Sequence, residues 1–308
     1  YFAGFTGGRK AFLPGIAGED GRPIWAFFAN VGQCMGGFGV NNRETPITPF
    51  DSATLAYQNI TLKSFRTFIK IDGEVHQPFL KPHHSQTLSI NKSNFTITER
   101  NDQFEINITY SSVPHANFSA LIRKVAIKNI SASPATMAIV DGLPIMFPFG
   151  LSNGVYKEMV SLMAAYCEVH NLEHNAPFIK FKTSTSDNPM VSLVHNGNGF
   201  VSIDQDGKRL ANIVDIRNVF GHNLSLLTPD AFMHQDYESF SAGSQQTENK
   251  MPCAFSHVKK TIKSGENYVF YSLFGSFDSQ ASFNAAIDDL APKKIEAMIQ
   301  ESETLIEN

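Results

Sequence analysis

Apolar and polar side chains alternate along much of the chain, and this pattern predicts short β-strands. The clearest run is residues 104–110 (FEINITY), where every second residue is apolar, as in a strand with one buried face. Similar but less regular runs occur at residues 65–71, 95–98, 119–127 and 191–194. Residues 268–274 (YVFYSLF) are apolar on both faces, which predicts a central strand between two sheets.

Pairs of turn-forming residues separate these runs. They are Asp72-Gly73, Asn101-Asp102, Asp206-Gly207 and Ser264-Gly265, and such pairs can adopt the positive φ angles of tight hairpins. Repeated hairpins join antiparallel neighbours. The predicted fold class is therefore mainly β, a large antiparallel β-sandwich.

One segment inside the predicted sandwich has helical spacing instead. Met159, Leu162, Met163 and Tyr166 fall at i, i+3, i+4 and i+7, the spacing of one buried helical face. We expect a helical insertion near residues 155–167, packed through these side chains.

The composition changes after Gly275, where apolar stripes predict two helices. The first stripe is Phe283, Ile287 and Leu290, and the second, after Pro292, is Ile295, Met298, Ile299, Leu305 and Ile306. The second stripe continues to Asn308 without a glycine cap or a return to the sandwich. We interpret residues 276–308 as a helical linker that leads from a sandwich domain, residues 1–275, toward a further domain.

Composition and charge exclude several classes of function. The chain has 308 residues, of which 42% are hydrophobic, and a formal net charge of −4 without a long basic block. This charge pattern argues against nucleic acid and anionic membranes as partners. No apolar run approaches the ~20 residues of a membrane-spanning helix. The 26 Phe, against one Trp, indicate aromatic packing in a core more than a dedicated sugar-binding platform.

Cysteine usage favours a reducing, cytoplasmic location. Cys34, Cys167 and Cys253 are odd in number and far apart, which fits neither a disulfide framework nor a paired metal site. Seven N-glycosylation sequons would instead favour a secreted protein. They occur at Asn59, Asn91, Asn94, Asn107, Asn117, Asn129 and Asn223.

The motifs that could hold a metal or a phosphate have poor contexts. His170-Asn171-Leu172-Glu173-His174 matches H-x-x-E-H, but its surroundings predict a turn, whereas zinc chemistry needs both imidazoles on one helix face. Other candidates are His83-His84, which we interpret as solvated, and Asp204-Gln205-Asp206-Gly207, which we interpret as a hairpin tip. Glycine clusters at residues 4–8 and 36–39 lead into no helix that could receive a phosphate. We therefore expect no metal and no cofactor.

Acid chemistry on a glycoside would need a carboxylic acid close to the leaving oxygen. The acids in apolar or turn contexts are Asp51, Asp141, Asp187 and Asp215, and the sequence selects no pair among them. Asp141 opens an unusual apolar loop, residues 141–150 (DGLPIMFPFG). We expect no self-sufficient active site.

Four stretches resemble the N-terminal region of the cellobiose phosphorylase-like enzymes, glycoside hydrolase family 94 and its relatives. They are residues 37–44 (GFGVNNRE) with Pro49-Phe50 and Ala56-Tyr57, residues 65–70 (FRTFIK), residues 141–150, and residues 177–187. None of them is a catalytic signature, and together they span roughly residues 30–275.

The resemblance implies a galactose mutarotase-like super-sandwich, then a helical linker and an (α/α)6 barrel that carries the catalytic acid. It also implies a homodimer, and oligosaccharide and inorganic phosphate as substrates of the full enzyme. Asp141, Tyr156, Lys157 and Glu158 are then candidates for substrate binding at the rim of the active site. For the last three, an exposed first turn of a helix is the simpler interpretation, because polar residues are usual there.

Three hypotheses about function follow. The first is the N-terminal module of a glycoside phosphorylase or hydrolase that acts on β-linked oligosaccharides and is inactive alone. The second is an autonomous carbohydrate-binding sandwich, which predicts measurable sugar affinity. The third is a mutarotase-like sugar epimerase that uses a His and a carboxylate, which predicts anomer interconversion.

Overall fold

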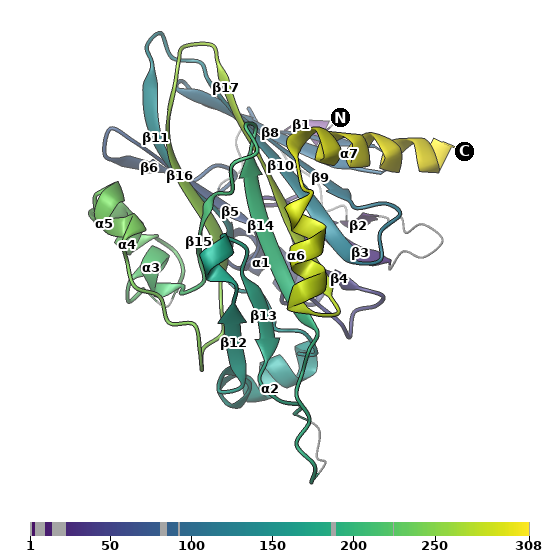
Figure 1. Cartoon of the computed structure of the whole chain (residues 1–308). Coiled ribbons are helices and arrows are strands. Elements are labelled where there is room, and N and C mark those ends of the chain that lie inside the picture. The colour runs from purple at the N-terminus through teal and green to yellow at the C-terminus, as the bar shows by residue number, and fades with distance from the viewer. Residues whose placement is uncertain are drawn as a thin grey trace.

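Two antiparallel sheets packed face to face form the body of the computed structural model (Figure 1). The structure describes residues 2–3, 10–13, 23–80, 85–91, 93–185, 189–223 and 225–307. The predicted fold class, a mainly β antiparallel sandwich, is confirmed.

The larger sheet has nine strands, and each pairs antiparallel with its neighbours. In spatial order they are β1 (Phe2–Ala3), β7 (Thr87–Ile90), β8 (Phe95–Arg100), β9 (Phe104–Ser112), β10 (Ser119–Asn129), β17 (Asn267–Phe277), β14 (Gly197–Asp204), β13 (Phe178–Phe181) and β12 (Cys167–His170). The central strand predicted at residues 268–274 is β17, which lies between β10 and β14.

Two smaller sheets complete the sandwich. The five-stranded sheet runs in the order β15 (Ala211–Ile213), β16 (Ala254–Ile262), β11 (Ala135–Leu143), β5 (Arg66–Ile71) and β6 (Glu74–His76). The three-stranded sheet is β2 (Lys10–Leu13), β3 (Ile24–Ala29) and β4 (Met35–Val40). All three sheets direct apolar side chains into one core. The side chains of β1 and β2 lie outside the described residues.

Local patterns set most of the hairpins. Asp72 and Gly73 both have positive φ angles, 50° and 88°, and they join β5 directly to β6 as the sequence predicts. Asn101-Asp102 joins the paired strands β8 and β9, and Asp206-Gly207 lies within the bridge between Ile203 and Arg209. The hairpin predicted at Ser264-Gly265 is wrong, because this turn links β16 to β17 of a different sheet. The strand predicted at residues 191–194 is wrong. Only Leu193 makes an isolated bridge there, and Val191 and Leu193 are 80% and 69% exposed, so no sheet face holds their side chains.

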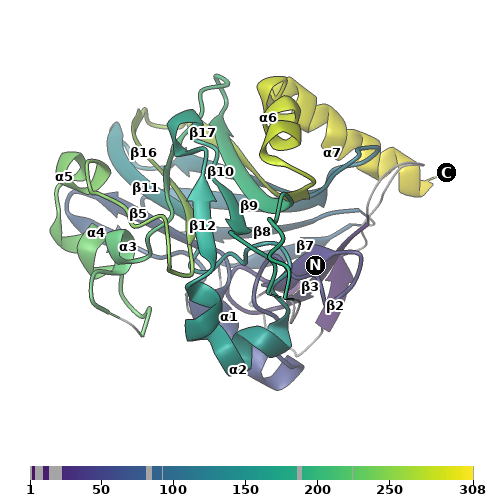
Figure 2. The ribbon, with the colours of Figure 1, turned by 60° about the horizontal axis from the view of Figure 1, so that its bottom comes forward.

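Seven helices surround the sheets in the described part of the chain. They are α1 (Ala53–Lys63), α2 (Asn153–Ala164), α3 (Arg217–Phe220), α4 (Asp230–His234), α5 (Tyr237–Ser241), α6 (Gln280–Asp288) and α7 (Pro292–Glu307). Figure 2 shows α1 and α2 together at one end of the sandwich, and α3 to α5 gathered beside β11 and β16. None of the helices described is long and apolar enough to cross a membrane.

The predicted C-terminal helix pair is present, but it does not run away from the sandwich. Side chains of α6 and α7 pack on the outer face of the nine-stranded sheet, where Phe283, Ile287 and Ile295 are buried. Gly199 on β14 allows this contact, since a Cβ there would come within 2.8 Å of the Phe283 ring. At the other end, the Ser302 hydroxyl donates to the carbonyl of Ser112 at 3.0 Å. The apolar stripes of this pair therefore face the sheet.

The insertion predicted near residues 155–167 is α2, but its predicted buried face is only partly buried. Met163 is 4% exposed, whereas Met159 and Leu162 are 42% and 51% exposed. The helix is kinked at Met159, whose φ and ψ are −134° and 29°. Because the kink interrupts the 3.6-residue periodicity, Tyr156 and Met163 pack against the sandwich while Met159 and Leu162 stay exposed.

The outer face of the five-stranded sheet buries a histidine. His257 on β16 lies under α5, with its Nδ1 atom 3.0 Å from the Tyr237 hydroxyl oxygen, and is 4% exposed. Burial lowers the pKa of His257 to about 4 from an ordinary 6.5. The neutral ring is therefore the form that the fold accommodates.

We expect His257 to lower the free energy of unfolding as the pH falls from about 6.5 to about 4. In that window the unfolded chain takes up a proton that the folded chain refuses, which costs up to about 3 kcal/mol of unfolding free energy. Urea unfolding across this range should show a flatter pH dependence for His257→Gln. The control His234→Gln removes an exposed histidine of neighbouring α4 and should leave the slope unchanged. Equal slopes for all three proteins would contradict this assignment.

Candidate functional site

The strand register buries Asp141 inside the sandwich. Met137, Ile139 and Asp141 alternate on one face of β11 and point toward the nine-stranded sheet, so the Asp141 side chain is only 1% exposed. Directly opposite on β5 is Thr67, whose hydroxyl donates to Asp141 Oδ1 at 2.6 Å.

Arg123 on β10 meets Asp141 from the other sheet. Its guanidinium forms an ion pair with the Asp141 carboxylate and donates to Gln33 Oε1 at 2.6 Å and to the Tyr110 hydroxyl at 3.3 Å. Burial alone would lower the pKa of Arg123, but Asp141 and Tyr110 together outweigh this effect and raise the pKa. We call Gln33, Thr67, Tyr110, Arg123 and Asp141 the core polar cluster. It satisfies Asp141 internally, so this residue joins the two sheets and lies away from any rim.

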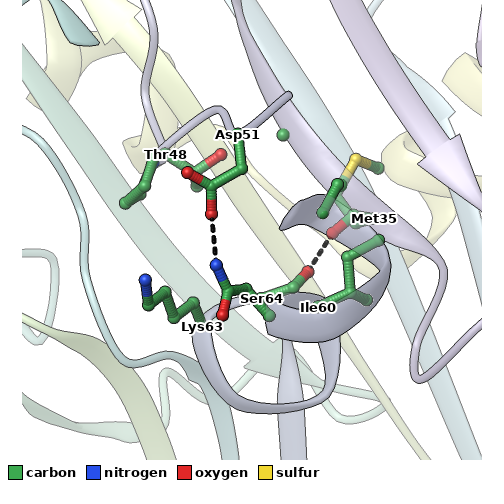
Figure 3. A pocket seen from close by; sticks show the side chains of 11 residues that line it. Met35, Thr48, Asp51, Ile60, Lys63 and Ser64 are labelled. Carbon is green, nitrogen blue, oxygen red and sulfur yellow. Dashed lines mark hydrogen bonds between the residues drawn. The ribbon is translucent and has the colours of Figure 1, made fainter. Parts of the chain in front are cut away.

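Asp51 lies at the end of the sandwich where α1 and α2 meet. Its Oδ2 accepts from Asn59 Nδ2 of α1 at 2.7 Å, and its Oδ1 lies 3.6 Å from Lys157 Nζ of α2. Figure 3 shows the carboxylate turned into a small pocket that Met35, Ile60 and Ser64 also line. The cavity volume is about 20 Å³, room for about one water molecule.

The three predicted rim residues lie on the first turns of α2. Tyr156 packs its ring 4.7 Å from that of Phe147, and burial together with the Asp51 charge raises the pKa of its hydroxyl. Lys157 is half exposed beside Asp51, and Glu158 is exposed. The structure therefore brings Tyr156 and Lys157 together with Asp51, and leaves Glu158 and Asp141 apart from them.

Several apolar side chains near Asp51, Tyr156 and Lys157 are exposed. Val155, Met159, Val160 and Leu162 of α2 are between 36% and 51% exposed, and Leu55 of α1 is 45% exposed. We call these five side chains the α2 apolar surface. Contiguous exposed apolar groups of this kind mark surfaces that other protein covers.

Stretches that carry the family resemblance converge at the same end. The Phe147 amide donates to the Ile47 carbonyl at 2.8 Å, and the Phe50 amide donates to Asn153 Oδ1 across 103 residues of sequence. Phe181, from the stretch at residues 177–187, shares a buried cluster with Phe147 and Met163. No local sequence pattern predicts these contacts, because they join residues far apart in the chain.

The remaining candidates from the sequence that the structure describes stabilise turns and ion pairs. Asp215 is ion-paired with Lys250; burial alone would raise its pKa, but hydrogen bonds from Lys250 and two backbone amides lower it. His170 to His174 form a strand end and a 3-10 turn, so the imidazoles do not share a helix face. Asp204 caps its hairpin by accepting from the Asp206 and Lys208 amides. Asp187, His83-His84 and the glycine cluster at residues 4–8 lie outside the described residues.

Metal and disulfide chemistry can be checked for the described residues. Among them, no three or more His, Cys, Asp or Glu side chains are grouped to hold a metal ion. Cys34, Cys167 and Cys253 are free and buried, and burial raises the pKa of each thiol.

Comparison with known proteins gave structural likenesses only. Neither the protein-family models nor the curated proteins contain a match. A polysaccharide lyase aligns at 10% identity with a TM-score of 0.48, over 86% of this chain and 34% of its own. A bacterial glucoamylase complexed with acarbose aligns at 10% identity and 0.46, over 97% of this chain and 38% of its own. A galactose mutarotase-like protein from Clostridium acetobutylicum aligns at 7% identity and 0.42, over 83% and 94%.

The chain thus spans 34% and 38% of the length of the first two structures. The identities and TM-scores of all three alignments are too low to support a conclusion about function. The resemblance to glycoside hydrolase family 94 stays a prediction.

Proposed function

We propose that this chain is a sandwich module of a carbohydrate-active enzyme, a glycoside phosphorylase or hydrolase that acts on β-linked oligosaccharides. In this proposal the module is inactive alone. The observation that carries it is the convergence of three family-like stretches around Asp51 and Lys157, beside an exposed apolar surface.

The α2 apolar surface is the proposed contact with a catalytic (α/α)6 domain of the same polypeptide. Its five apolar side chains would be buried by that domain, which offsets the cost of their exposure here. Lys157 and Tyr156 would then lie at the border of the contact, where the Lys157 ammonium can reach a sugar hydroxyl. A homodimer of the full enzyme belongs to the same proposal.

The length and activity of the native protein test this function. An antibody raised against this chain should isolate a polypeptide well above 34.0 kDa that releases a sugar or sugar phosphate from β-linked oligosaccharides. Assays with and without inorganic phosphate separate phosphorolysis from hydrolysis. A native polypeptide of 34.0 kDa would reject the module, and anomer interconversion by it would support an epimerase instead.

The rim role of Lys157 can be tested in that native enzyme. We expect Lys157→Ala to raise KM roughly fivefold with little change in kcat, because it removes a binding contact rather than a reacting group. The matched control is Lys263→Ala, on the turn between β16 and β17, where the side chain is 76% exposed. Equal KM values for both variants would place the rim elsewhere.

A further inference from the structure

A second polar site lies at the edge strand β12, which follows α2 in the chain. There the outer faces of β12 and β13 and the first turn of α6 enclose a groove with a cavity volume of about 490 Å³. Ligand pockets typically measure about 300–1,000 Å³. The groove is therefore large enough for a small ligand, unlike the water-sized pocket beside Asp51.

The floor of the groove is an ion pair set by strand register. Glu168 on β12 lies directly opposite Lys180 on β13, and the Lys180 ammonium approaches Glu168 Oε1 to 2.5 Å. The two side chains are only 15% and 19% exposed. Burial alone would raise the pKa of Glu168, but hydrogen bonds from Lys180 and His170 outweigh it and hold the pKa below its ordinary value. The pair therefore presents a fixed acceptor beside a fixed donor.

Further polar groups and a second lysine complete the lining. Thr183, His195 and Gln280 line the groove together with Lys182. The Lys182 ammonium lies 2.7 Å from Glu248, but both groups are exposed, at 36% and 58%. An exposed ion pair of this kind contributes about 1 kcal/mol or less, so an incoming anion can replace Glu248.

Both lysines of the groove are ion-paired, Lys180 with the buried Glu168 and Lys182 with the exposed Glu248. Glu248 is not part of the lining, so an anion that displaces it meets the positive charge of Lys182. A sugar hydroxyl both donates and accepts a hydrogen bond, which the adjacent Glu168 and Lys180 side chains can satisfy together.

We propose that this groove binds an acidic saccharide, a sugar that carries a carboxylate or a phosphate. Lys182 meets the anionic group, and the Glu168–Lys180 pair meets ring hydroxyls. The saccharide part rests on the proposed carbohydrate function, but the site is separate from the rim at Lys157.

Binding to the isolated chain tests the groove directly. Calorimetry with D-glucuronate and with glucose 1-phosphate should give millimolar or tighter affinity for one or both, and at least roughly tenfold weaker binding of D-glucose. Inorganic phosphate distinguishes a sugar site from a simple anion site. Binding of phosphate as tight as that of glucose 1-phosphate would reject the saccharide.

Matched lysine variants locate the binding. Lys182→Gln should weaken glucuronate binding roughly fivefold and reduce its salt dependence, and Lys180→Gln should weaken it more because Glu168 would then repel the anion. Lys263→Gln removes the same charge on the turn between β16 and β17 and should leave glucuronate binding unchanged. Equal losses in Lys182→Gln and Lys263→Gln, or no binding at roughly 20 mM ligand, would overturn the proposal. Neither outcome bears on the length or activity of the native polypeptide, so the two proposals fail separately.

Discussion

Replacing Asp141 with alanine should lower the free energy of unfolding by about 3–5 kcal/mol, because it leaves Arg123 as a buried charge without a carboxylate. The side chains of Arg123 and Asp141 are 0% and 1% exposed, so water cannot take the place of the lost partner. Urea unfolding at neutral pH, followed by circular dichroism, measures the effect.

Two further variants make this prediction specific. Glu266→Ala breaks the exposed pair with Lys263 and should cost about 1 kcal/mol or less. The double variant Arg123→Met, Asp141→Leu removes both charges and should be less destabilised than Asp141→Ala. If Asp141→Ala costs no more than Glu266→Ala, the core polar cluster does not hold the sheets together.

Phe274→Ala should cost a similar amount, about 3–5 kcal/mol, by opening a cavity at the centre of the sandwich. Phe274 on β17 is 1% exposed, and its ring centroid lies 5.0 Å from that of Phe65 and 5.6 Å from that of Phe200. Phe200 lies on the neighbouring strand β14 of the same sheet, and Phe65 comes just before β5 of the facing sheet. The Phe274 side chain therefore fills the space between the layers.

The same unfolding experiment gives the controls for Phe274. Leu227→Ala truncates a side chain that is 58% exposed and should change stability by less than about 0.5 kcal/mol. Phe274→Leu keeps most of the volume and should cost less than Phe274→Ala. Equal losses for the two Phe274 variants would argue against a cavity as the cause.

The sequence predicts those parts of the fold that depend on neighbours in the chain. Alternation locates β9 and β10, and Asn101-Asp102 locates the hairpin between β8 and β9, because side-chain direction and φ angles are local properties. The short helices α3, α4 and α5 escape prediction, since four or five residues hold too little periodicity. They form through contacts such as the Lys70 ammonium, which donates to carbonyls at the end of α4.

The candidate sites are predictable only in part. Family resemblance and a helical pattern locate Tyr156 and Lys157, but their neighbour Asp51 comes from a separate loop before α1. Asp141 shows why a polar residue in a strand is ambiguous. The pattern cannot say which face it occupies until the register with β5 and β10 places Thr67 and Arg123 against it. The groove at Glu168 depends on β13 and α6 together, so no single segment reveals it.

The place of β17 in the sheet also shapes how the chain acquires its fold. Its partner β10 ends near residue 129 and its partner β14 near residue 204, while β17 begins only at Asn267. Contacts between such distant segments form slowly, because a long loop must close before they contribute. Until β17 is synthesised, β10 and β14 keep unpaired edges that can pair with other chains. The nascent protein is therefore most prone to aggregate just before its central strand emerges.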